Sequence, residues 1–124
     1  LLSFMDNYLG LRAGPGALAD PAHHDVHVPQ WGRSATAPLG AVAHLQLRPL
    51  IVDAEIVGFW EFCPDAQEVV WNVLRPLRPA QSVAVEDEAA AVGTFLREQI
   101  GHARAFSLDT DDSARERVHR VRDL

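Results

Sequence analysis

The sequence predicts an α+β fold, in which a small antiparallel β-sheet or barrel packs against a helix near the C-terminus. Residues 51–60 place two β-branched apolar runs on either side of a tight turn at 53–55, a pattern typical of a β-hairpin. Residues 83–105 instead repeat apolar side chains at spacings of three and four, as one face of a helix does. Strands followed by a packed helix are the α+β pattern.

The strands are expected to form a three-stranded meander. Residues 45–48 alternate apolar and polar side chains, and the hairpin spans residues 50–62. Pro49 lacks an amide donor and therefore marks an edge position or a bulge, whereas Gly58 indicates a bulge or a close backbone approach. Residues 68–74 supply the third strand.

The helix is expected at about residues 83–105, with Ser82 as its N-cap. Its apolar stripe consists of Val85, Ala89, Val92, Leu96, Ile100 and Ala103. Earlier in the chain, Asp20 followed by Pro21 predicts the start of one short helix that extends to about Asp25. We therefore expect one barrel-like domain over residues 1–106, followed at 107–124 by a polar C-terminal tail or a short helix.

The amino-acid composition limits the classes of function that the chain can have. The chain has 124 residues, a size typical of one domain, and a formal charge of −6, which makes it a poor nucleic-acid binder on its own. All 11 basic residues are arginine, and the single cysteine, Cys63, excludes an internal disulfide. No apolar run approaches the roughly 20 residues that cross a bilayer. We therefore expect a cytoplasmic protein with no membrane partner.

The first residues suggest a piece of a longer protein. The chain opens on Leu1 and Leu2 with no initiator methionine and no polar lead-in. Removal of a pro-segment is the alternative explanation.

Four segments together resemble a known family. The opening "LLSFMDNYLG" at 1–10, "LADP" at 18–21 and the hairpin "IVDAEIVGFW" at 51–60 are similar, in this order, to segments of winged-helix DNA-binding domain proteins. The helix that ends at 94–96 resembles the last helix of those proteins. The resemblance covers about residues 1–97, and the superfamily includes bacterial DNA glycosylases that repair alkylated and crosslinked DNA.

The resemblance implies both a position and a role. In that family these segments lie in a C-terminal β-barrel that follows tandem winged-helix modules, so the expected partners are those upstream domains and, through the parent protein, double-stranded DNA. The catalytic motif of the glycosylases lies outside this segment. No catalytic residue is therefore carried over, and whether the parent is an enzyme stays open. We expect a noncatalytic domain with no cofactor.

The chain departs from the family pattern at several positions. Ala13 and Gly14 replace an acidic–basic pair, and Glu61 and Phe62 stand where relatives often have basic residues. Ala54 replaces a turn glycine, which disfavours a two-residue turn and predicts a longer or wider one. The alternative function is a stand-alone small barrel that binds a small apolar ligand or forms a homodimer through a sheet edge.

Three arginines and two histidines are the candidate site residues. Arg12, Arg33 and Arg48 are the basic residues best placed to contact a phosphate backbone if the domain flanks a duplex, although solvated surface is the favoured interpretation. His23 and His27 would share a helix face and could bind a metal ion if other histidines converged on them. Surface histidines are the favoured interpretation, so no metal site is expected.

The other reactive side chains favour structural roles. Cys63 has acidic sequence neighbours, which disfavour a nucleophilic thiolate. Four carboxylates are candidates for a general acid–base pair, but we interpret them as surface groups on strands: Asp6, Glu55, Glu61 and Glu68. Trp31, Trp60 and Trp71 favour core packing over base stacking.

Overall fold

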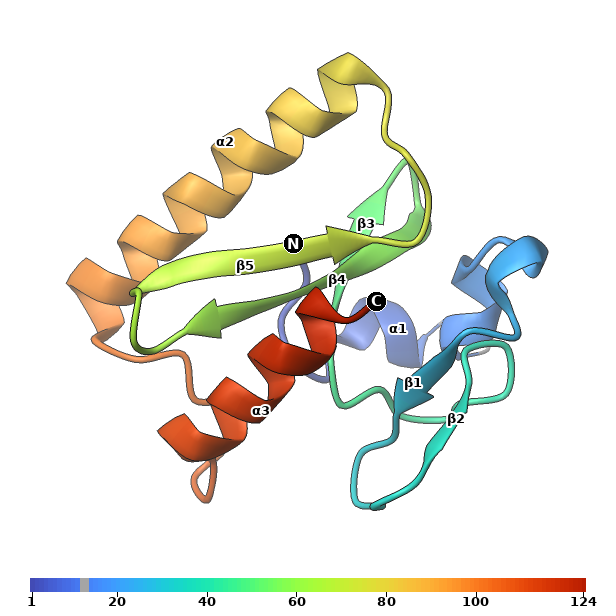
Figure 1. Ribbon diagram of the computed structural model, residues 1–124, viewed down its shortest axis with the longest axis horizontal. Helices are drawn as coiled ribbons and strands as arrows, with labels where there is room; N and C mark the ends of the chain where they lie inside the picture. The colour runs from blue at the N-terminus through green and yellow to red at the C-terminus, as the bar shows by residue number, and fades with distance from the viewer. Residues whose placement is uncertain (12–13) are drawn as a thin grey trace.

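A computed structural model describes residues 1–11 and 14–124 (Figure 1). Its helices are α1 (Asn7–Gly10), α2 (Pro79–Phe95) and α3 (Asp111–Arg122), with 3-10 turns at Pro15–Leu18 and Pro21–His23 and a π-helical turn at Leu96–Ile100. Its strands are β1 (His27–Pro29), β2 (Thr36–Pro38), β3 (Arg48–Val52), β4 (Glu55–Cys63) and β5 (Glu68–Val73). The α+β prediction is confirmed.

The strands form two small antiparallel sheets. One pairs β1 with β2, and the other is the expected meander in the order β3-β4-β5. Within residues 1–11 and 14–124, neither sheet closes on itself, so the sheet alternative holds and the barrel alternative does not. Helices cover the three-stranded sheet instead of further strands (Figure 1).

Helices α2 and α3 cover opposite faces of the three-stranded sheet. Val85 of α2 packs with Leu50 and Val57, whereas Val121 of α3 belongs to the larger cluster that contains Ile56 and Phe59. Alternate residues of a strand normally point to opposite faces of the sheet. Strand β4 contains one extra residue, a β-bulge, which shifts this alternation, so Ile56 and Phe59 belong to the same cluster although they are three residues apart. Figure 1 shows α2 along one side of β5 and α3 on the other side of the sheet.

The turn between β3 and β4 differs from its prediction. It contains only two residues, Asp53 and Ala54, with φ angles of 52° and 66°. Positive φ at both positions is the type I′ geometry whose twist matches a hairpin. The expected longer turn is therefore wrong. The Asp53 carboxylate stabilises the tight turn, since it accepts hydrogen bonds from Arg78 at 3.0 Å and Gln81 at 2.9 Å.

The predicted irregularities of the hairpin are confirmed. Leu50 pairs with Gly58, but Ile51 pairs with Ile56, so Val57 is the extra residue of a β-bulge. A Cβ atom on Gly58 would lie 2.1 Å from the Asn72 carbonyl oxygen, which only glycine avoids. Strand β3, which contains Pro49, lies at the edge of the sheet order, where a missing amide donor is tolerated.

Helix α2 begins earlier and ends earlier than predicted. Pro79 occupies its first turn, and Arg78 rather than Ser82 is the N-cap, with its backbone N–H donating to the Gln81 side chain at 3.0 Å. The α-helical geometry ends at Phe95, and the π-helical turn ends at Ile100, where Gly101 is the C-cap with a φ of 79° that suits glycine. Residues 101–105 are therefore not helical.

The C-terminal residues form a short helix, which was one of the expected alternatives, and this helix packs on the sheet. Thr110 caps α3 by accepting a hydrogen bond from the Ser113 N–H at 3.2 Å. Val118 and Val121 are buried on the inner side of this helix. Residues 111–122 therefore complete the core of the domain that was expected to end near residue 106. No helix in the described part of the chain is long and apolar enough to cross a membrane.

Candidate functional site

Four charged side chains meet in the interior and form what we call the ion cluster: Arg48, Glu61, Asp109 and Arg117. They come from β3, β4, the loop before α3 and α3 itself. Each is at most 5% exposed, and Glu61 is fully buried. Two positive and two negative groups balance, which is the condition under which charges are tolerated away from water.

Glu61 is the centre of the ion cluster. Its Oε1 atom accepts hydrogen bonds from Arg48 Nη1 and from the Phe62 N–H at 2.8 Å, and its Oε2 atom accepts from Arg117 Nε. Arg48 also donates from Nη2 to the Ala103 carbonyl oxygen, and its guanidinium lies 5.1 Å from the centre of the Trp60 ring. The cluster therefore joins β3, β4 and the loop after α2.

Arg117 extends the ion cluster to Asp109. Its Nη1 and Nη2 atoms donate to the two carboxylate oxygens of Asp109 at 2.9 and 2.8 Å, a bidentate pair. Asp109 also accepts from the backbone N–H groups of Ala105 at 2.9 Å and Thr110 at 3.1 Å. Among the residues that the structure describes, every buried side-chain nitrogen and oxygen has a hydrogen-bond partner.

The electrostatics of the cluster follow from burial and pairing. Burial is the largest influence on Arg48 and lowers its pKa, against the attraction of Glu61. Burial also opposes ionisation of Asp109, but hydrogen bonds from Arg117 and Ala105 together hold the pKa of Asp109 below its ordinary value. The lowered pKa of Asp109 keeps its carboxylate ionised at neutral pH, opposite the Arg117 guanidinium. The arrangement is suited to tying α3 and residues 103–110 to the sheet.

The ion cluster corrects two expectations. Glu61 was expected on the surface of a strand, and Arg48 was a candidate for contact with phosphate; both are buried and paired, so neither can reach a nucleic acid. Arg33 is exposed in the turn between β1 and β2, as a phosphate contact requires. Arg12 lies outside the described residues.

The candidate metal ligands do not share a helix. The 3-10 turn ends at His23, and His27 begins β1, where its Nδ1 atom lies 3.1 Å from Thr36 Oγ1. In residues 1–11 and 14–124, no group of three or more histidine, cysteine, aspartate or glutamate side chains could hold a metal ion. Asp20 caps the turn as predicted, since it accepts from the Ala22 N–H at 2.8 Å.

The three tryptophans and the cysteine pack against other side chains, although Trp31 and Trp71 are only half-buried; Trp71 packs against the cluster of Leu50, Val57 and Val85. Trp60 and Cys63 are buried in β4. Trp31 contacts Phe4 and Phe106 edge-on, with ring centroids 4.9 and 4.6 Å apart, and so joins three distant segments.

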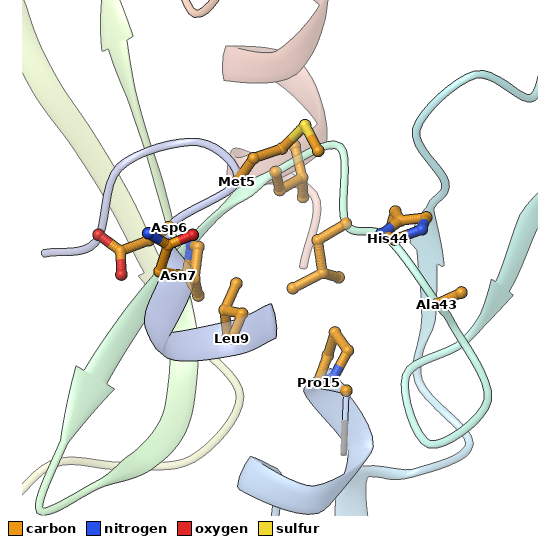
Figure 2. Close-up of a pocket in the computed structure, with 11 residues that line it drawn as sticks. Met5, Asp6, Asn7, Leu9, Pro15, Ala43 and His44 are labelled. Carbon is orange, nitrogen blue, oxygen red and sulfur yellow. The ribbon is translucent and has the colours of Figure 1, made fainter. Parts of the chain in front are cut away.

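A second feature is a cavity of about 320 Å³ between α1 and the segment that leads into β3, which we call the α1 cavity (Figure 2). Its lining residues are Met5, Asp6, Asn7, Leu9, Gly14, Pro15, Ala43, His44, Leu45, Leu47 and Pro49. Sequence reasoning missed this cavity, because its walls come from segments that the pattern assigns to separate elements.

Comparisons of the chain with family models, with curated proteins and with solved structures find no match. The fold and the ion cluster therefore define a small α+β domain with a charged, fully paired interior.

Proposed function

We propose that this chain is a noncatalytic domain of a winged-helix DNA-binding protein. In this proposal it braces upstream winged-helix domains and adds a phosphate contact to double-stranded DNA. The observation that supports it most is the way in which the segments with the family resemblance contact one another.

The opening segment and the hairpin are joined by hydrogen bonds. The Trp60 indole N–H donates to the Leu2 carbonyl oxygen at 2.9 Å, and the Leu2 N–H donates to the Pro49 carbonyl oxygen at 3.2 Å. The segment at 18–21 joins the same hairpin through a parallel bridge between Ala19 and Ile56. Segments far apart in sequence thus build one structural unit, as the ordered motifs of a shared fold would.

The polar residues of these segments have structural partners. Asp6 caps α1 by accepting from the Tyr8 N–H at 2.8 Å, and Asp20 caps the following turn. Asp53 stabilises the hairpin turn through Arg78 and Gln81. These roles support a scaffold function, because the side chains that define the resemblance maintain the architecture.

Arg33 is the residue that we propose for the DNA contact. It is exposed in the turn between β1 and β2, which projects away from α2 (Figure 1). Among the described residues, no carboxylate forms an ion pair with its guanidinium. An unpaired arginine on a projecting turn can neutralise one phosphate and release its counterion.

The test is duplex binding measured as a function of salt concentration. We would use the chain and, where its gene encodes winged-helix segments upstream, the complete protein. Arg33→Ala is expected to weaken the complete protein's binding on all duplex sequences and to reduce the slope of log K against log salt by about 1. The matched control is Arg97→Ala, since Arg97 is exposed but already paired with Glu98.

Two results would contradict the proposal. A complete protein without salt-dependent affinity for duplex DNA would remove the DNA function. Equal effects of Arg33→Ala and Arg97→Ala would remove the specific contact at the β1–β2 turn.

A further inference from the structure

The α1 cavity has an apolar floor. Leu45 and Leu47 are 6% and 1% exposed, and Pro15 is buried beside them. Figure 2 shows Leu9 extending from α1 toward the centre of the cavity. The volume of about 320 Å³ lies at the lower end of the range for small-molecule sites. These walls suit an apolar ligand of fragment size better than a polar one.

Met5 lies at the mouth of the cavity. It is 60% exposed, and its φ of 54° falls in the left-handed region that L-residues avoid. Figure 2 shows its side chain above the other lining residues, with the thioether extending in the direction of His44. A flexible sulfur-containing side chain at a pocket mouth adapts to ligand shape and makes favourable contacts with aromatic rings.

His44 supplies a polar group across the mouth from Met5. Its side chain is exposed, and its backbone carbonyl is fixed by a hydrogen bond from the Trp31 N–H at 3.0 Å. Figure 2 places the imidazole at the edge of the cavity, opposite α1. In contrast, each oxygen of the Asp6 carboxylate already accepts a hydrogen bond, Oδ1 from the Tyr8 N–H at 2.8 Å and Oδ2 from the Ser3 hydroxyl at 3.3 Å. The imidazole can form one directed hydrogen bond with a ligand.

We propose that the α1 cavity binds a small aromatic molecule that carries one hydrogen-bonding substituent. The ring lies on the apolar floor beneath Met5, and the substituent meets the His44 imidazole. This inference is independent of the proposed DNA function, because Arg33 does not line the cavity.

The first experiment is a titration of the chain with 4-chlorophenol. Binding is monitored through the changes in amide chemical shifts in ¹H–¹⁵N spectra. A ligand of this size should bind with a Kd on the order of 1 mM. We expect saturating shifts at Leu9, Ala43 and Leu45. Shifts that stay linear throughout the titration, or that lie elsewhere, would overturn the proposal.

A pair of matched variants locates the site. Ala43 is exposed and lines the cavity, whereas Ala41 is exposed and does not. Ala43→Trp fills the mouth of the cavity without removing a core side chain. It should weaken the binding of 4-chlorophenol at least about tenfold. Ala41→Trp should leave the affinity unchanged. Equal affinities for the two variants would contradict the assignment.

His44→Ala tests the polar contact. In the native chain, 4-chlorophenol should bind about fivefold more tightly than chlorobenzene, which lacks the hydroxyl, since a hydrogen bond contributes about 1 kcal/mol. In His44→Ala this ratio should approach one, with little change for chlorobenzene. An unchanged ratio in His44→Ala would overturn the role of the imidazole.

Discussion

The carboxylate of Glu61 in β4 and the guanidinium of Arg117 in α3 form a buried ion pair between residues 56 positions apart in the chain. Both groups are largely shielded from bulk water, since Glu61 is fully buried and Arg117 is 5% exposed. The pair therefore fixes the C-terminal helix to the central strand.

Replacing Glu61 should destabilise the protein strongly. Glu61→Gln leaves the Arg48 guanidinium without a buried counter-charge and leaves Arg117 with Asp109 alone. Breaking a buried ion pair typically costs about 3–5 kcal/mol. The free energy of unfolding in urea measures the effect. Asp65→Asn is the control, because it breaks the exposed pair with Arg115 and should change little. Similar losses for both variants would show that burial of the cluster is unimportant.

Asp109 should make stability depend on pH in the acid range. Its pKa is lower in the folded state than the ordinary value of 3.8. The unfolded chain therefore takes up its proton first, and the stabilisation is complete above the ordinary pKa and lost as pH falls through the folded pKa. Unfolding free energies of the native chain and Asp109→Asn, measured from neutral to acid pH, should converge below about pH 4. A constant difference across this range would contradict the prediction.

Ala54→Gly should stabilise the hairpin. Ala54 holds a φ of 66°, which is unfavourable for an L-residue and accessible to glycine. We expect a gain of up to about 1 kcal/mol, since relief of the left-handed conformation outweighs the greater freedom of glycine in the unfolded chain. Thermal denaturation measures the gain. The control is Ala66→Gly in the next turn, because Ala66 does not have a positive φ and its replacement should be neutral or destabilising. If both variants were stabilised, relief of the left-handed conformation at Ala54 would not be the cause.

Val121→Ala tests whether α3 belongs to the core. Val121 is fully buried, so its truncation should lower the free energy of unfolding by roughly 1–3 kcal/mol. The comparison is Leu108→Ala, because Leu108 is 83% exposed just before the helix and should tolerate the change. If the Val121→Ala variant had the same free energy of unfolding as the native chain, residues 111–122 would not be packed on the sheet.

Local features were predictable from the sequence, whereas contacts between distant residues were not. The hairpin and most of α2 follow from short patterns, and Gly58 and Pro49 marked irregularities that the structure contains. The turn at Ala54 was mispredicted, because side-chain contacts from Arg78 and Gln81 to Asp53 override the local preference.

The ion cluster could not be assembled from sequence, because its four members lie in separate elements. A signal was nevertheless present. Glu61 interrupts the apolar run at 59–63, and Arg117 shares the inner face of α3 with Val118 and Val121. A charge at an inward position of a strand or helix predicts a buried partner. Identifying that partner requires the tertiary structure.

A double-mutant cycle on Glu61 and Arg117 tests the central claim most directly, namely that the interior charges act together to fix α3 to the sheet. The variants are Glu61→Gln, Arg117→Met and the combination, each measured by urea denaturation. The structure predicts that the double variant is more stable than the sum of the single losses implies, with a coupling of about 1–3 kcal/mol. Losses that add within about 0.5 kcal/mol would contradict it.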